Sequence, residues 1–387
     1  MFDVLYRNAS APREEYRNEA EAARKCAAYG VREGSQAYSD CMYPQQKRRD
    51  GRRGRNGRQS RFNMNLASLM LAIILLLACT AVAYVYRFRG VVRYTRFTQY
   101  LRKSWPVFAP FNCLLYMATH RSARHAVMEA DYLEGVSALR RNWRRIRGEA
   151  LALHESGAFE AASAPGSVGF HDLGFRTFHK RGWRKFYLKW YGEPHGSAVR
   201  LCPDTVKLLS RVPGIRAAMF SVLPAGAELT LHSDPLACSL RYHMGLQTPE
   251  SDECYICVDG QRMSWRNGVD FVFDETYPHF ARNDSDAPRL ILMCDVDRPM
   301  NLFGRSFNRL YSLLARAMVV PNTDEDPQGV VTWLFARVAP LRTLGGQLRQ
   351  ANRPVYTALK VLLNTALMAL FLLPTYLVVA FFARVIQ

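Results

Sequence analysis

Two histidines and an aspartate in the second half of the chain have the types and spacing of a metal site. His232 and Asp234 stand two positions apart, so both point to the same side of an extended chain leaving a strand. His279 follows later and must come from a second strand brought alongside. Two histidines and one carboxylate form the facial triad of non-haem Fe(II) enzymes, which leaves positions open for a cosubstrate and for O2. The spacing therefore predicts Fe(II) held by His232, Asp234 and His279.

An arginine downstream fits the cosubstrate of such an iron centre. Arg289 opens the apolar run R-L-I-L-M, next to the strand expected to hold His279. The distal carboxylate of 2-oxoglutarate needs a bidentate partner in a buried pocket, and a guanidinium provides one. A lone H-x-D is common, whereas H-x-D, a later histidine and this arginine in one β-rich region are more specific. We expect Arg289 to hold 2-oxoglutarate.

The residues around this site read as short strands broken by turns. Helical sequence at 136–160 precedes them. The predicted strands are 186–191, 217–223, 228–232, 239–246, 254–259, 270–274, 278–283 and 289–296, with turns such as P-A-G, S-D-P, V-D-G and R-N-G. Many short strands with few helices between them predict a mainly β jelly roll, which can bring His279 beside His232.

Several motifs in this region, in this order, resemble the aspartyl/asparaginyl β-hydroxylase family of Fe(II)/2-oxoglutarate dioxygenases. They are H-S-D-P, S-L-R-Y-H-M-G-L, W-R-N-G, F-D-E-T-Y-P-H and P-R-L-I-L-M-C-D-V, within residues 136–300. The resemblance implies a double-stranded β-helix, a jelly-roll or cupin-like domain with flanking helices. It also implies Fe(II), 2-oxoglutarate and O2 as the reactants that accompany the substrate.

The resemblance assigns roles position by position. His232 and His279 match the iron histidines of the family. The positions matched to 2-oxoglutarate contacts are Ser221, Arg241, His243 and Arg289. Animal members that hydroxylate peptides lack the carboxylate ligand, whereas this chain has Asp234, which resembles the bacterial membrane-bound branch of lipid A 2-hydroxylases. That branch hydroxylates a secondary acyl chain of lipid A at the cytoplasmic face, and W-R-K-F-Y-L-K-W-Y and P-N-T-D-E-D also resemble it.

Two apolar runs flank the predicted domain. Leu66–Tyr86 carries no charge and is long enough to cross a ~30 Å hydrocarbon core. Val361–Ala383 is a second run, in which Asn364 and Pro374 are tolerable. Basic residues follow the first run and precede the second, which predicts a domain on the cytoplasmic side of the inner membrane. The basic residues before the first run favour the opposite orientation.

The charge indicates what kind of partner to expect. A formal net charge of +19 implies an anionic one. Between Lys47 and Arg61 the basic residues alternate with glycines and not with aromatic residues, so we expect no nucleic acid. This arm either touches anionic lipid or forms a solvated tail. Lipid A or a related anionic acylated glycolipid, in a membrane, is the expected partner. Nine scattered cysteines favour a reducing compartment.

The chain therefore divides into six predicted segments. They are a basic arm at 1–63, not made if translation starts at Met64, a transmembrane helix at 64–86, a basic juxtamembrane segment at 87–135, the dioxygenase domain at 136–300, an amphipathic segment at 301–358 and a second transmembrane helix at 359–384. Within the amphipathic segment, Phe303–Met318 reads as a helix that lies in the membrane interface or packs on the core. Two other functions stay open: β-hydroxylation of Asp or Asn in a protein, and an inactive lipid-binding or nucleic-acid-binding barrel.

Overall fold

The computed structural model describes residues 69–172, 174, 182–363 and 365–366, with 23–24 and 27–28 near the N-terminus. The chain divides into two units, and the second, Leu76–Leu362, contains both sheets. The basic arm and most of the second apolar run lie outside the described residues, so both stay predictions.

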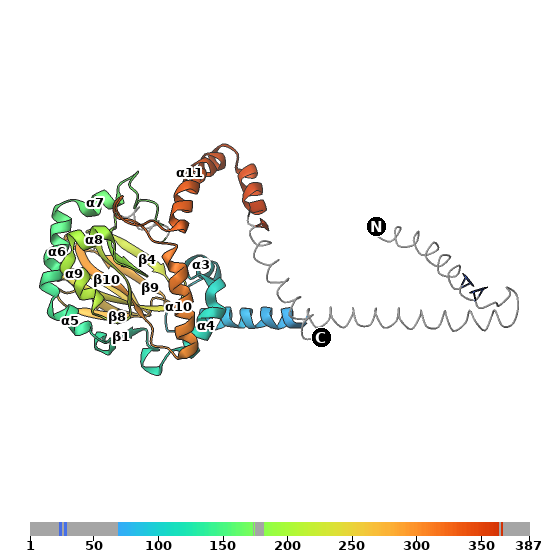
Figure 1. The fold of residues 1–387 in the computed structure, drawn as a ribbon, viewed down its shortest axis with the longest axis horizontal. Coiled ribbons are helices and arrows are strands. Elements are labelled where there is room, and N and C mark those ends of the chain that lie inside the picture. Colours follow the sequence, from blue (N-terminus) through green and yellow to red (C-terminus); the bar gives the residue numbers. More distant parts are fainter. Residues whose placement is uncertain are drawn as a thin grey trace. The chain divides into compact units, whose positions relative to one another are not determined.

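Two antiparallel sheets build the domain (Figure 1). The larger has the order β1-β8-β5-β10-β3-β2 and the smaller β4-β9-β6-β7. Their bounds are β1 Val127–Met128, β2 Arg184–Trp190, β3 Ile215–Leu223, β4 Glu228–His232, β5 Ser239–Gln247, β6 Cys254–Val258, β7 Gln261–Ser264, β8 Asp270–Phe273, β9 His279–Asn283 and β10 Arg289–Asp297. Every predicted strand is present, which confirms the mainly β prediction. The two-residue β1 and the polar β7 were not predicted.

The central strand β10 shows how the sequence separates two cores. Leu290, Leu292 and Cys294 belong to a core beneath the helices, whereas Ile291 and Met293 belong to a second core that both sheets share. Successive side chains of a strand point to opposite faces, so the odd-numbered residues of β10 face the space between the sheets. The flanking strands β3 and β5 follow the same parity. This parity aims Ser221, Arg241, His243 and Arg289 into one interior.

Helices cover the outer face of the larger sheet (Figure 1). They are α5 Val136–Arg141, α6 Trp143–Glu155, α7 Ala158–Ser163, α8 Gly196–Leu201 and α9 Pro203–Ser210. The predicted helical stretch 136–160 is confirmed as α5, α6 and the start of α7, interrupted at Asn142 and at Gly157, where φ is +71°. The pair α8 and α9 was not predicted.

An apolar helix at Leu69–Arg87 is long enough to cross a membrane, as the first apolar run predicted. It is the only such helix in the described part of the chain. After it come α3 Phe97–Lys103, the 3-10 turns η1 Pro106–Phe108, η2 Arg121–Ala123 and η3 Ala130–Tyr132, and α4 Ala109–Ala118. Beyond the sheets lie α10 Leu302–Arg316, which confirms the predicted amphipathic helix, and α11 Val330–Ala351, which was not predicted.

Candidate metal and cosubstrate site

The end of β4 and the start of β9 bring the three predicted metal ligands together. In the antiparallel pairing of these strands, His232 lies opposite His279. Asp234 follows on the turn after β4, and its Oδ1 lies 3.6 Å from Nε2 of His232. One ligand atom from each of the three side chains lies within 4.8 Å of the others. Two imidazoles and one carboxylate at this separation fit a single divalent ion of the Fe(II) type.

The backbone orients both imidazoles. Nδ1 of His232 lies 2.9 Å from the carbonyl oxygen of Thr230, and Nδ1 of His279 lies 2.9 Å from that of Tyr277. A carbonyl only accepts a hydrogen bond, so each Nδ1 carries the proton and each Nε2 presents its lone pair. Burial lowers the pKa of His232 and lowers that of His279 to about 3. Both rings are therefore neutral near pH 7, the form that binds metals.

The turn that carries Asp234 is held from two sides. The backbone N–H of Asp234 donates to the carbonyl of Glu275 at 2.8 Å, and that of Ser233 donates to the carbonyl of Lys103 at 2.8 Å. The hydroxyl groups of Tyr94 and Ser233 lie 2.9 Å apart. Lys103 and Tyr94 belong to the segment expected to be merely juxtamembrane, so that segment supports the candidate metal site.

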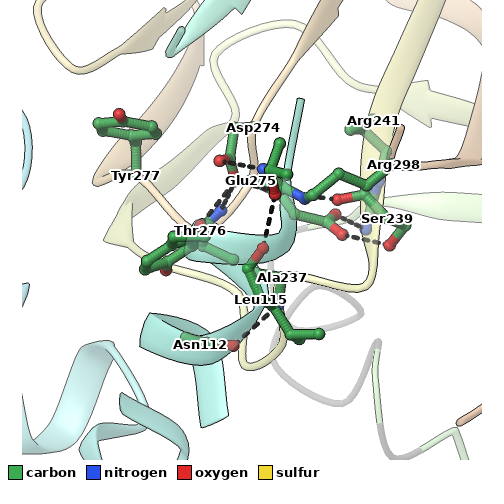
Figure 2. Close-up of polar contacts among 12 residues, drawn as sticks. Asn112, Leu115, Ala237, Ser239, Arg241, Asp274, Glu275, Thr276, Tyr277 and Arg298 are labelled. Carbon is green, nitrogen blue, oxygen red and sulfur yellow. Dashed lines mark hydrogen bonds and ion pairs between the residues drawn. The ribbon is translucent and has the colours of Figure 1, made fainter. Parts of the chain in front are cut away.

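Arg241 lies among three carboxylates. It forms ion pairs with Asp234 at 3.3 Å and with Asp295 at 2.9 Å. It also forms an ion pair with Glu275 (Figure 2). Burial would raise the pKa of Asp234, but Arg241, the two histidines and a hydrogen bond with Glu275 together outweigh it. The net shift of the pKa is downward, so Asp234 is ionised and suited to a cation. Burial raises the pKa of Glu275 well above its usual value. Arg241 thus faces the site through Asp234, and its predicted contact with 2-oxoglutarate stays a prediction.

Arg289 is buried in the interior and has no acidic partner in the described part of the chain. It is 1% exposed, its Nη2 lies 3.5 Å from Oγ of Ser221, and its guanidinium stacks 4.2 Å from the ring centre of Trp265. Burial lowers its pKa to about 10, so it is still a cation near pH 7. A buried cation without a counterion is costly, and a carboxylate in the same pocket would remove that cost. This surrounding fits the distal carboxylate of 2-oxoglutarate.

His243 lies in the same interior. Its Nδ1 accepts a hydrogen bond from Nε1 of Trp265 at 3.4 Å, and Nε2 has no hydrogen-bond partner within the described residues. Burial lowers the pKa of His243 far below its usual value, so its ring is neutral. With Nδ1 accepting, the proton lies on Nε2, which is a donor ready for a ligand oxygen.

Four side chains of this region escaped sequence reasoning. They are Trp183 and Trp265 beside Arg289, and Glu275 and Asp295 beside Arg241. The parity of β10 could have placed Asp295 in the interior with Arg289. The two tryptophans open the motifs W-R-K-F-Y-L-K-W-Y and W-R-N-G, but no local signal places them beside Arg289, because they reach it from segments distant in sequence.

A small cavity of about 20 Å³ lies beside Asp234. It is lined by the end of the apolar helix, by the segment after it and by the metal-site turn, including Val85, Tyr86, Tyr100, Trp105, Asn112 and Asp234. Arg89 fixes this wall, because its guanidinium binds Asp274 at 2.7 Å and stacks on Tyr116 and Tyr277. The end of a candidate membrane span therefore borders the candidate metal site.

Residues 140–299 match the model of the family described as Aspartyl/Asparaginyl beta-hydroxylase. Over these residues, the chain is similar to that family. An ornithine lipid ester-linked acyl 2-hydroxylase of Rhizobium tropici is 32% identical over 152 residues, 39% of this chain and 53% of the relative. The human aspartyl/asparaginyl beta-hydroxylase is 31% identical over 176 residues, 44% of this chain and 22% of the relative.

The matched region thus has one relative named for a lipid and another named for amino-acid side chains. The chain spans about half, or less, of the length of these curated relatives. Among solved structures, a cupin_2 domain of an XRE family transcriptional regulator from Enterobacter cloacae is 19% identical, with a TM-score of 0.18, over 21% of this chain and 79% of that one. A score this low adds nothing to the strand order described above.

Proposed function

We propose that this chain is a membrane-anchored, Fe(II)- and 2-oxoglutarate-dependent dioxygenase that 2-hydroxylates a secondary acyl chain of lipid A. The match of residues 140–299 to the family model supports a hydroxylase. The donor set His232, Asp234 and His279, next to a buried guanidinium without a counterion, supports the iron and the cosubstrate. The domain would work at the cytoplasmic face of the inner membrane.

The residues of the site fit both the iron ion and 2-oxoglutarate. Nε2 of His232, Nε2 of His279 and the ionised Asp234 would hold the iron, which supplies the O2-dependent oxidation coupled to conversion of 2-oxoglutarate into succinate and CO2. Arg289 and Ser221 would anchor the distal carboxylate of the cosubstrate, and Nε2–H of His243 would donate to one of its oxygens. The protein's own contribution is positioning and the exclusion of water between the two sheets.

The assignment of a lipid rests on one observation above the others. The cavity beside Asp234 is lined by Val85 and Tyr86, the last turn of the apolar helix Leu69–Arg87. A substrate that reaches Asp234 from this side would come from the membrane surface. The Rhizobium tropici relative, named for acyl 2-hydroxylation of a lipid, is in keeping with this direction. Asp234 itself provides the carboxylate ligand that a complete facial triad needs.

Hydroxylation of Asp or Asn side chains in a protein is the second candidate. The human relative, named for aspartyl/asparaginyl hydroxylation, favours it. The same iron and cosubstrate residues would serve both reactions, so the site alone does not separate them. The position of the metal-site turn beside the end of the apolar helix supports the lipid.

The decisive experiment is an assay on membranes that contain the full chain. Lipid A, Fe(II), 2-oxoglutarate and O2 are supplied, and lipid A is analysed by mass spectrometry. We expect one acyl chain to gain one oxygen atom, with succinate formed in proportion, and the His279→Ala variant to form neither. Unchanged lipid A with a hydroxylated peptide in the same membranes would replace the lipid assignment with the protein one.

A further inference from the structure

The helix α10 has three distinct faces. Gly304, Asn308 and Ala315 form the face that packs on the domain, and Nδ2 of Asn308 donates to the carbonyl of Cys238 at 2.7 Å. A second face is apolar and uncovered, and a third carries arginines. A helix that only covered the core would need the first face alone. The other two faces therefore require an explanation outside the domain.

The apolar face of α10 extends onto α4. On α10 it comprises Leu302, Phe303, Leu310, Leu313 and Leu314, which are 55–70% exposed. On α4 it continues with Phe111, Leu114 and Met117, of which Met117 is 66% exposed. The two helices lie next to each other (Figure 1). The rings of Phe111 and Phe307 lie 6.4 Å apart between them. A contiguous apolar surface across two helices marks an interaction site.

The arginine face of α10 forms one wall of a groove of about 580 Å³. Positions 305, 309, 312 and 316 repeat at intervals of three and four, so Arg305, Arg309, Ser312 and Arg316 share one stripe of the helix. Arg216 and Arg298 line the groove from the sheet side. Among the described residues that line it, Asp297 is the only acid.

Three of the five groove arginines have no acidic partner among the described residues. Arg216 binds Asp297 at 2.9 Å, Arg298 binds Asp274, and Nε of Arg316 donates to the carbonyl of Tyr191 at 2.7 Å. In the described part of the chain, Arg305 and Arg309 form no ion pair. Like charges one helical turn apart weaken a helix unless an anion lies between them. A guanidinium pair matches the oxygens of a phosphate.

We infer that the arginine face of α10 binds the phosphate of an anionic lipid while the adjoining apolar face of α10 and α4 enters the same bilayer surface. The apolar helix Leu69–Arg87 brings a bilayer to this domain, and basic residues beside an apolar face are typical of helices that lie in an interface. The inference rests on the proposed function and deepens it. It names a phosphorylated lipid, the class to which lipid A belongs, as what the domain contacts at the membrane surface.

The test measures hydrogen exchange of the α10 peptide in the full chain, reconstituted into nanodiscs. The discs contain phosphatidylcholine alone or phosphatidylcholine mixed with phosphatidic acid. We expect slower exchange of Leu302–Arg316 in the mixed discs, and loss of that difference in the double variant Arg305→Ala/Arg309→Ala. Alanine favours helices, so we expect the variant to keep α10 folded. Exchange of α10 in phosphatidylcholine discs equal to that of the unaltered chain verifies this, and unchanged exchange of β5 and β10 verifies the domain. The variant Arg305→Lys/Arg309→Lys keeps the charge but loses the paired N–H donors of the guanidinium. It should retain part of the difference in exchange between the two kinds of disc.

The matched control removes the same charge elsewhere. Arg144 and Arg145 are exposed on α6, and their replacement by alanine should leave the lipid effect intact. Equal exchange in both kinds of disc would overturn the inference. Millimolar inorganic phosphate is added to phosphatidylcholine discs in a separate measurement. If it slows exchange of α10 as much as phosphatidic acid does, the assignment of the bound phosphate to a lipid is rejected. If protection of α10 from exchange increases with protein concentration, the apolar face of α10 and α4 binds a second copy of the chain and not a membrane.

This readout needs neither iron nor turnover, so the two proposals fail separately. Lipid-dependent protection with no hydroxylated lipid A would retain the phosphate site and reject the proposed reaction. Hydroxylated lipid A without lipid-dependent protection of α10 would retain the reaction and reject the phosphate site.

Discussion

Arg289 and Arg241 face the same interior, yet their surroundings are opposite. Arg241 is compensated by Asp234, Glu275 and Asp295, whereas Arg289 has aromatic rings and one hydroxyl around it. Removing Arg241 would leave several buried carboxylates without their cation. Removing Arg289 leaves none. Arg289 is therefore the position at which a cosubstrate role can be tested without collapse of an ion-pair network.

The variant Arg289→Lys keeps the positive charge and loses the planar fork. Hydrogen bonds to charged groups contribute about 1.5–3 kcal/mol, so we expect the KM for 2-oxoglutarate to rise roughly 10- to 100-fold. Succinate formation at varied 2-oxoglutarate concentration measures the KM, and thermal unfolding checks the fold. The exposed Arg144→Lys change is the matched control. A fall in kcat at constant KM would refute the anchoring role.

Replacement of one candidate metal ligand tests the donor set. In His279→Ala the site retains one imidazole and one carboxylate, so we expect iron content to fall from stoichiometric to near background. Elemental analysis of the purified full chain after anaerobic loading with Fe(II) provides the measurement. His125→Ala, at an exposed position, should keep its iron. Full iron retention by His279→Ala would show that the cluster is not the site.

At the scale of elements, the pattern of residues predicted the strands well and the contacts between them poorly. The alternation of β10 and the start of β9 at His279 follow from apolar periodicity and turn residues, because both signals are local. The sequence Q-R-M-S of β7 is polar, so its pairing with β6 has no local signal. The ion pairs of Arg241 join β5 to β10 and to the loop after β8, and such cross-strand registers depend on the closed fold. The contacts by which Arg89 holds the wall of the cavity beside Asp234 were not predicted either, because they also join segments distant in sequence.

The buried Asp274 joins the segment after the apolar helix to the sheets. It binds Arg89 at 2.7 Å and also Arg298 (Figure 2). Replacing Asp274 with asparagine leaves two buried cations without their counterion. We expect the free energy of unfolding to fall by about 3–5 kcal/mol. Thermal unfolding of the full chain in detergent measures the loss, and Asp252→Asn, at an exposed position, should leave stability unchanged.

The same carboxylate predicts how stability depends on pH. Burial alone would raise the pKa of Asp274, but Arg298 and Arg89 lower it below the ordinary value of 3.8. A depressed folded-state pKa contributes stability that is complete above the unfolded pKa and is lost as the pH falls toward the folded one. Melting temperature should therefore drop below about pH 4, and less steeply in Asp274→Asn. Equal acid slopes in both proteins would contradict this assignment.

The proposed function requires a particular orientation of the whole molecule in the membrane. The hydroxylase domain follows an apolar helix and would lie on the cytoplasmic side. Protease added to intact spheroplasts should leave the domain uncut, whereas protease added to inverted membrane vesicles should cleave it. A periplasmic marker protein controls for intact membranes. Cleavage in spheroplasts would place the domain on the other side and remove its access to cytosolic 2-oxoglutarate.

Val85 and Tyr86 belong both to the apolar helix and to the cavity beside Asp234. A helix in a bilayer that is thicker or thinner than its apolar length tilts or deforms the lipid around it. Here such an adjustment would move one wall of the cavity along with the helix. Membrane thickness, set by the length and saturation of the lipid tails, would then determine which acyl carbon lies level with the iron. The thickness of the membrane would thus contribute to the choice of the carbon atom that is hydroxylated.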